Sequence, residues 1–180
     1  MTEAIVVPLK RFDRAKERLR RNPDLDVATI AEDLARGVLS SSQPRTVIVV
    51  SEDPDVTRFA VSQGAEVWSS IAANLNDAVQ GAYKGLSDRF DRLIIVHGDL
   101  LYPEGLGTFV PLPGITFFAD HHGSGTNVLA IPTRLDFHFA YGTNSLRRHV
   151  DEAERLNVTY RVVTTSPWRF DVDEPSDLPD

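Results

Sequence analysis

Residues 93–100 read LIIVHGDL, an apolar run that ends in a glycine and an aspartate. A short run of β-branched and aliphatic residues without polar alternation is typical of a strand that is buried on both faces. Such strands occur in parallel sheets that helices cover on both sides. This stretch therefore indicates an α/β fold, and it puts a carboxylate directly after a buried strand.

Similar apolar runs recur along the chain and alternate with segments of helical periodicity. We expect strands at Ala4–Val7, Thr46–Val50, Ala65–Trp68, Leu93–Val96, Ile115–Ala119, Val128–Ile131 and Tyr160–Val163. We expect helices from Val27 to Val38 after Asp26 as N-cap, from Pro54 to Gln63, from Leu75 to Leu86 and from Leu146 to Leu156. Only a glycine-rich loop separates the fifth and sixth strands, so the mostly parallel sheet becomes mixed. No repeat or linker interrupts the pattern, which favours a single domain over residues 1–180.

The composition excludes several classes of protein. The chain has 180 residues, no cysteine and a formal net charge of −7. The lack of cysteine excludes disulfides, zinc–thiolate sites and cysteine nucleophiles, and the acidic balance argues against general nucleic-acid binding. No apolar run approaches the roughly 20 residues that span a bilayer, and the N-terminal MTEAIVVPLK has the pattern of a strand rather than of a signal peptide. We therefore expect a cytoplasmic protein that binds neither nucleic acid nor membrane.

Positive charge is concentrated just after the first expected strand, in VPLKRFDRAKERL at residues 7–19. Lys10, Lys16 and Arg18 follow the strand end, where open α/β sheets bind their ligands. Cations in that place can hold the phosphates of a nucleotide. The segment lacks the glycine patterns of a P-loop or a Rossmann turn. The alternative is an amphipathic helix whose cations face solvent.

Two acidic segments are placed to bind a cation. Asp99 follows the strand at residues 93–96, and Asp171 and Asp173 lie two residues apart in FDVDEPSDL. Residues at that spacing share one face of a strand, and carboxylates on one face repel each other unless a cation lies between them. Oxygen ligands of this kind suit a hard divalent cation. The alternatives are a turn aspartate at Asp99 and an acidic surface turn at the C-terminal segment.

Two loops combine glycines with short polar side chains. DHHGSGTN at residues 120–127 includes Thr126 and Asn127, and YGTNSLRRH at residues 141–149 includes Gly142 and Ser145. Glycines allow the backbone to approach a ligand closely, and exposed N–H groups at a helix start favour an anion. Ordinary helix capping is the alternative for the second loop.

Arg147 and Arg148 lie at the start of the last expected helix, where cations oppose the helix dipole, which suggests that they serve a ligand or a partner. The histidines at 97, 138 and 149 have no metal-ligand spacing and are expected in packing or hydrogen-bonding roles. Neither feature by itself identifies a function.

Taken in order, the motifs VPLK, AKERL, GDL, DHHGSGTNVL, YGTNSLRRHVDEAERL and DVDEPSDL resemble a known family. They are similar to the 2-phospho-L-lactate and phosphoenolpyruvate guanylyltransferases of coenzyme F-420 biosynthesis. The resemblance covers nearly the whole chain, and GTN and DVD-x-P-x-DL are its most specific parts. The wider group is the GT-A-like nucleotidyltransferases.

The resemblance implies a three-layer α/β/α sandwich around a mostly parallel mixed sheet, like the nucleotide-diphospho-sugar transferases. It implies GTP as co-substrate, with Lys10, Lys16 and Arg18 near its phosphates and the segment of Asn74 and Asn76 near the nucleotide. Family members usually have glycine where Asn74 stands. Lys16 would be catalytic together with Asp99 and Asp173.

For the metal, the resemblance implies Mg²⁺ held by Asp99 and Asp173 with Asp171 assisting. For the second substrate, Thr126, Gly142 and Ser145 match positions that hold the carboxylate of the acid, and Asn127 lies beside them. The family usually reads A-D-L-P-L where this chain reads HGDLLYP at residues 97–103, so the aspartate is kept while its neighbours differ.

The function implied is transfer of GMP from GTP to the phosphate of a small phospho-acid, with release of pyrophosphate. The acid is left open between 2-phospho-L-lactate, phosphoenolpyruvate and 3-phosphoglycerate. The alternatives are a cytidylyl- or uridylyltransferase acting on a sugar phosphate, and an inactive nucleotide-binding homologue. The expected partners are small molecules, and a homodimer is left open.

Overall fold

The computed structural model describes residues 2–14, 16 and 18–178 and arranges its strands in one sheet. The strands are β1 (Glu3–Pro8), β2 (Thr46–Val50), β3 (Glu66–Trp68), β4 (Arg92–Val96), β5 (Ile115–Ala119), β6 (Thr126–Pro132) and β7 (Tyr160–Val163). The α-helices are α1 (Val27–Ser41), α2 (Pro54–Ser62), α3 (Leu75–Leu86) and α4 (Ser145–Arg155). Short 3₁₀ helices occur at η1 (Phe12–Arg14), η2 (Leu19–Arg21), η3 (Pro167–Arg169) and η4 (Pro175–Asp177). All the strands and α-helices expected from the sequence are present, with ends shifted by a few residues.

The sheet is mixed and mostly parallel, as predicted. Its strand order is β3-β2-β1-β4-β6-β5-β7. β1 runs parallel to both β2 and β4, whereas β6 runs antiparallel to β4 and β5. The antiparallel strand follows from the direct β5–β6 connection, because two strands joined by a short loop pair in opposite directions.

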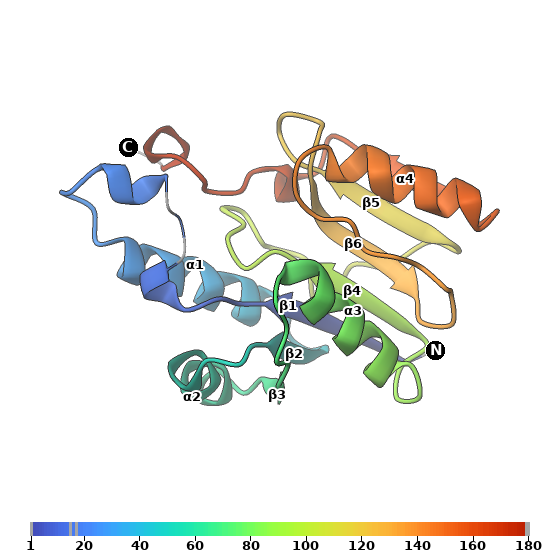
Figure 1. Cartoon of the computed structure of the whole chain (residues 1–180), viewed down its shortest axis with the longest axis horizontal. Coiled ribbons are helices and arrows are strands. Elements are labelled where there is room, and N and C mark those ends of the chain that lie inside the picture. Colours follow the sequence, from blue (N-terminus) through green and yellow to red (C-terminus); the bar gives the residue numbers. More distant parts are fainter. Residues whose placement is uncertain (1, 15, 17, 179–180) are drawn as a thin grey trace.

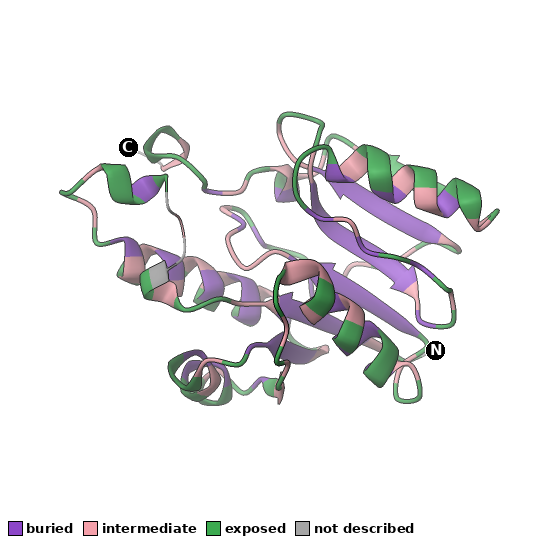
Figure 2. Ribbon diagram, viewed as in Figure 1, coloured by how far each residue is buried: buried purple, intermediate pink, exposed green. Residues whose placement is uncertain are grey.

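Helices cover both faces of the sheet, which gives the predicted three-layer α/β/α sandwich. Alternate residues of one strand point to opposite faces, so Ile5 and Val7 of β1 pack with α1 and α2, while Ala4 and Val6 pack with α3 and α4. Figure 1 shows α3 and α4 over the sheet on the side that faces the viewer. Figure 2 shows that the central strands are buried while each helix keeps an exposed face; the edge strands β3 and β7 are partly exposed.

Local signals explain where the helices begin. Asp26 caps α1 by accepting the N–H of Thr29, as predicted, and Asp53 caps α2 just before Pro54. Asn74 caps α3 by accepting the N–H of Asp77.

Among the described residues, no helix has the length and apolar composition that crossing a membrane requires.

The amphipathic α-helix that is the alternative for the basic N-terminal segment does not form in the described part of that segment, and the strand considered for Asp171 and Asp173 does not form either. In its described part, the basic N-terminal segment forms η1 and η2 rather than an amphipathic α-helix; Ala15 and Glu17 of the AKERL motif lie outside the described residues. The segment of Asp171 and Asp173 makes an isolated bridge between Leu100 and Asp171 instead of a strand. The N-terminal and C-terminal segments nevertheless lie side by side (Figure 1), at the edge of the sheet where β1 and β4 end.

Candidate active site

A large cleft opens along this edge of the sheet. Its volume is about 1250 Å³. It lies where the parallel strands β1, β2 and β4 end and the antiparallel strand β6 begins, so loops from both halves of the sheet meet there. The cleft is lined by eleven of the twelve predicted site residues: Lys10, Lys16, Arg18, Asn74, Asp99, Thr126, Asn127, Gly142, Ser145, Asp171 and Asp173.

Three of the predicted carboxylates converge at one wall of the cleft. Asp99, Asp171 and Asp173 each offer an oxygen, and these atoms lie within 4.8 Å of one another. The convergence has a local cause: Leu100 bridges to Asp171, and the N–H of Val172 donates to the carbonyl of Asp99 over 3.1 Å. The predicted meeting of carboxylates distant in sequence is therefore confirmed.

The side chain of Lys16 lies among these carboxylates. Its Nζ pairs with Asp99 and lies 3.2 Å from Oδ1 of Asp173. Lys16 has a left-handed backbone with φ of 57°. Burial acts to lower the pKa of Lys16, but Asp99 and Asp173 outweigh it and raise the pKa. Lys16 is thus a buried, fully charged ammonium.

The acidic side chains differ in how they are stabilised. Burial acts to raise the pKa of Asp99, but Lys16 and His97 more than compensate, so this pKa is lowered. For Asp171, burial and the charge of Asp99 raise the pKa. One ammonium against three carboxylates leaves an excess of negative charge, because one positive group cannot balance three anions.

The trio meets the chemical requirements of a hard divalent cation. Its donors are all oxygens, which Mg²⁺ prefers. Oδ1 of Asp99 is buried and has no hydrogen-bond partner in the described part of the chain, although buried carboxylate oxygens are normally bonded. The geometry therefore fits a cation at Asp99, Asp171 and Asp173.

The cationic wall of the cleft is attached to the C-terminal segment. Arg18 pairs with Glu174 over 3.3 Å, and Leu19, Val27 and Val172 pack together in a small apolar cluster. Lys10 lines the cleft near the end of β1. The structure thus brings the predicted phosphate-binding cations to the same cleft as the acidic trio.

The predicted nucleotide-side asparagines serve different roles. Asn74 lines the cleft while its side chain caps α3. Asn76 bonds twice to Tyr141, since its Nδ2 donates to the carbonyl over 3.2 Å and its Oδ1 accepts the N–H over 2.6 Å. Because Asn76 is not among the residues that line the cleft, its geometry supports a role in holding the loop of Tyr141.

The opposite wall carries short polar groups. Thr126 starts β6, Ser145 starts α4, and the backbone N–H of Thr126 donates to Oγ of Ser145 over 3.0 Å. Gly142 lies between Thr126 and Ser145 in the sequence, and its φ of 110° is a conformation that favours glycine. Asn127 points to the other face and donates to Oδ1 of Asp171 over 3.0 Å. Asn127 is therefore placed to orient a carboxylate of the trio.

The two arginines at the start of α4, Arg147 and Arg148, bond to groups within the chain. Arg147 pairs with Asp151 over 2.8 Å, and Arg148 donates to the carbonyls of Tyr141 and Thr143. The helix itself and the preceding loop thus supply acceptors for both side chains, and a role toward a ligand or a partner stays a prediction.

Sequence reasoning missed several residues of the cleft. Ser51, Glu52 and Asp53 line it, as do Asp120 and His122. The first three directly follow β2, so the rule that ligands bind beyond parallel strand ends could have identified them. Asp120 and His122 belong to the glycine-rich loop at residues 120–127, which the sequence indicates as a candidate ligand loop without assigning these two side chains a role.

The fold is similar to that of solved nucleotidyltransferases. A nucleotidyl transferase from Methanothermobacter has a similar fold, with a TM-score of 0.65 and 15% identity over 98% of this chain and 94% of that one. The 4-diphosphocytidyl-2C-methyl-D-erythritol synthase from Anaerococcus prevotii is similar with a TM-score of 0.64 and 9% identity, over 98% of this chain and 94% of that one. At these identities the likeness establishes the fold.

The sequence identifies the family. The model described as Guanylyl transferase CofC like matches residues 3–180, and the chain belongs to this family of guanylyltransferases. A phosphoenolpyruvate guanylyltransferase from Sphaerobacter thermophilus is 31% identical over 99% of this chain and 91% of that protein. A 2-phospho-L-lactate guanylyltransferase from Methanocaldococcus fervens is 23% identical over 97% of this chain and 82% of that protein. The resemblance drawn from the motifs is confirmed.

Proposed function

We propose that this guanylyltransferase transfers GMP from GTP to the phosphate of phosphoenolpyruvate and releases pyrophosphate, as a step of coenzyme F-420 biosynthesis. Two relatives named for phosphoenolpyruvate are 31% and 32% identical, whereas the relative named for 2-phospho-L-lactate is 23% identical. 2-Phospho-L-lactate is therefore the second candidate and 3-phosphoglycerate the third. All three acids carry a phosphate and a carboxylate on three carbons.

One observation carries the proposal: the acidic trio and Lys16 meet at one wall of a cleft whose other wall presents Thr126 and Ser145. A cleft of about 1250 Å³ has room for a nucleotide and a small acid together. The supporting features are the cations Lys10 and Arg18 along the same cleft. We propose that residues 1–180 act as one nucleotidyltransferase domain, since the family match spans residues 3–180.

The residues have distinct proposed roles. Asp99, Asp171 and Asp173 would hold Mg²⁺, which when bound supplies neutralisation of phosphate charge. Lys10, Lys16 and Arg18 would bind the phosphates of GTP, and Asn74 would lie beside the nucleotide with Asn76 supporting the neighbouring loop. Thr126, Gly142 and Ser145 would hold the carboxylate of the acid, with Asn127 orienting Asp171.

In the proposed reaction, a phosphate oxygen of the acid attacks the α-phosphorus of GTP in line. The bond from the α-phosphorus to the bridging oxygen breaks, and pyrophosphate leaves with the electron pair. The attacking oxygen is already anionic near neutral pH, so no general base is required. The work of this chain is then to hold the reactants in line and to stabilise charge.

The test is pyrophosphate release by the purified protein with Mg²⁺. Each of GTP, CTP, UTP and ATP is paired with phosphoenolpyruvate, 2-phospho-L-lactate, 3-phosphoglycerate and glucose 1-phosphate. We expect GTP with phosphoenolpyruvate to give the highest kcat/KM. A higher value for CTP or UTP with the sugar phosphate would favour the alternative transferase, and tight GTP binding without pyrophosphate release would favour an inactive homologue.

A further inference from the structure

His149 is a buried histidine beside the cleft. It lies on α4 with no exposed surface, its ring stacked on Phe117 at 6.2 Å and in edge contact with Tyr141 at 4.8 Å. Burial lowers the pKa of His149 to about 3, and electrostatic interactions with His97 and Arg148 act in the same direction. The imidazole is therefore neutral at physiological pH and has one ring proton.

The hydrogen bonds of His149 determine which nitrogen carries that proton. The backbone N–H of Ala140 points at Nε2 over 2.9 Å. A backbone amide donates and cannot accept, so Nε2 is the acceptor and Nδ1 carries the proton. Nδ1 lies 3.1 Å from Oγ1 of Thr126, and it must donate to that hydroxyl.

This donation determines what Thr126 offers to the cleft. Its hydroxyl oxygen is occupied as an acceptor, while its own proton is left over. Ser145 is in the same state, because its Oγ accepts the N–H of Thr126 over 3.0 Å. Both residues line the cleft, and neither hydroxyl has an acceptor within residues 2–14, 16 and 18–178. Thr126 is 1% and Ser145 is 3% exposed, so their two hydroxyl protons lie just beneath this wall without an acceptor in the described part of the chain.

We propose that His149 is a positioning residue that turns the hydroxyl of Thr126 into a donor toward the carboxylate of the acid substrate. The inference rests on the proposed function, which places the acid against Thr126 and Ser145. A carboxylate only accepts hydrogen bonds, and bonds to it are charge-assisted and stronger than those to a neutral hydroxyl. We call the two hydrogen bonds from Ala140 to His149 and from His149 to Thr126 the relay. The relay therefore selects a phospho-acid over a sugar phosphate.

Two substitutions separate the relay from packing. His149→Asn retains an amide nitrogen close to the position of Nδ1, so it keeps a donor to Thr126. His149→Gln places its amide close to the position of Nε2, so it keeps an acceptor for Ala140 and loses the donor. Both variants put a smaller, neutral amide among the same aromatic rings, which makes them matched controls for packing.

The measurement is steady-state kinetics with saturating GTP and the acid that wild type uses best. We expect His149→Gln to raise the KM for the acid about 10-fold, with kcat and the KM for GTP within about twofold of wild type. We expect His149→Asn to restore most of the acid KM. Equal KM values for the acid in the two variants, or parallel losses for GTP and acid, would overturn the proposal.

A double-mutant cycle with Thr126→Val tests whether His149 acts through Thr126. Valine has the shape of threonine without the hydroxyl. If the relay operates, His149→Gln adds less than about twofold to the acid KM once the hydroxyl is absent. Independent effects that multiply in the double variant would contradict it.

A spectroscopic measurement separates this inference from the proposed function. Nitrogen-15 NMR of the ligand-free protein reports the tautomer of His149 directly. We expect a neutral ring protonated at Nδ1 throughout pH 5 to 8. A ring protonated at Nε2 would overturn the inference even if the enzyme is active, while a wild type that uses none of the acids would overturn the proposed function even if the tautomer is as expected.

Discussion

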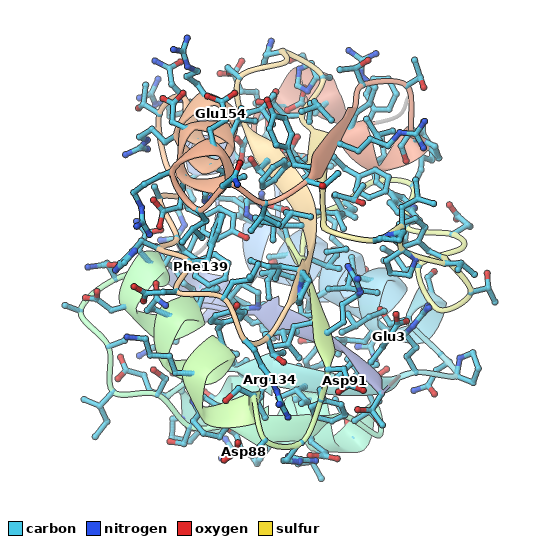
Figure 3. The ribbon with its side chains drawn as sticks, turned by 90° about the vertical axis from the view of Figure 1, so that its right-hand side faces the viewer. Glu3, Asp88, Asp91, Arg134, Phe139 and Glu154 are labelled. Carbon is cyan, nitrogen blue, oxygen red and sulfur yellow. The ribbon has the colours of Figure 1, made fainter. Side chains whose placement is uncertain are left out.

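Two clusters of charged side chains lie at opposite ends of β1 and β4 and differ in how fully their charges are satisfied. At the strand starts, Arg45 pairs with Glu3 over 2.9 Å and donates to the carbonyls of Leu106 and Gly107. Arg92 donates to the carbonyl of Gly114 over 2.8 Å and lies 3.8 Å from Glu3, although its buried Nε has no hydrogen-bond partner in the described part of the chain. Figure 3 looks onto this end of the molecule and labels Glu3.

The cluster at the strand ends has the opposite character. Asp99, Asp171 and Asp173 share one ammonium, that of Lys16, and Oδ1 of Asp99 has no partner in the described part of the chain. The first cluster uses its charge to fix the loop after β4. The second cluster has carboxylate oxygens that could still bind a cation. The arginines of the first cluster mostly bond to carbonyls of the chain, which indicates a structural role, whereas the excess of carboxylates in the second cluster indicates a place for a cation.

The largest expected effect is on catalysis at the strand ends. Asp99→Asn should lower kcat by at least about 100-fold, since charge-stabilising groups are typically worth that much. The substitution also breaks the ion pair with Lys16, and the lowered pKa of Asp99 means that its charge stabilises the fold, so the melting temperature should fall while the protein still folds. Pyrophosphate release and thermal denaturation measure the two quantities. Near-normal turnover would contradict the assignment of Asp99.

The strand-start cluster should show the reverse behaviour. Arg45→Met leaves Glu3 and several carbonyls without their donor, which should cost about 3 kcal/mol of unfolding free energy and lower the melting temperature by about 6–12 °C. Arg45→Lys retains the charge and should lose less. The turnover per folded molecule at low temperature should match wild type. An unchanged melting temperature would show that this cluster does not stabilise the fold.

The ammonium of Lys16 lies within the acidic cluster at the strand ends, so its removal tests whether a cation can take its place. Lys16→Met removes the ammonium between Asp99 and Asp173, so kcat/KM for GTP should fall about 10- to 50-fold, the cost of a lost charged hydrogen bond. The variant should also gain more melting temperature from millimolar Mg²⁺ than wild type, because the cation no longer competes with the ammonium. An equal or smaller gain would mean that Lys16 does not occupy the cation's place.

The smallest effect concerns a third, satisfied cluster on α4. Glu152 bonds to Arg155 and His138, and chiefly the bond from Arg155 lowers the pKa of Glu152 to about 2. A lowered carboxyl pKa adds stability that is complete above pH 4.5 and is lost as the pH falls toward 2. Glu152→Gln should therefore melt a few degrees below wild type at pH 6 and converge with it near pH 2. Kinetics near neutral pH serve as the control and should not change.

Much of the fold could be predicted because it depends on local signals. Runs such as Thr46–Val50 and Leu93–Val96 are apolar throughout, and Asp26 and Pro54 mark helix starts. The convergence of Asp99 and Asp173 is implied by the motifs GDL and DVDEPSDL through their resemblance to the guanylyltransferases. These features depend on residue type and spacing, which the sequence contains directly.

Other features depend on contacts between distant segments. Lys16 meets carboxylates 83 and 157 residues away, and nothing in its own segment specifies which oxygens it reaches. Asn127 has its amide engaged by Asp171 and the carbonyls of Trp168 and Arg169. The hydroxyl proton that Thr126 offers depends on His149, whose tautomer is set by the backbone N–H of Ala140. Any residue other than proline would supply that N–H at position 140. Residue type alone does not indicate such a partner.

Binding of Mn²⁺ in place of Mg²⁺ tests the central claim most directly, because it requires no turnover. Electron paramagnetic resonance would count free Mn²⁺ during titration of wild type, Asp99→Asn and the strand-start control Glu3→Gln. We predict that Asp99→Asn weakens binding at least about 10-fold, since it removes a charged oxygen ligand, while Glu3→Gln binds as wild type does. Equal affinity in all three proteins would contradict a cation site at the ends of β1 and β4.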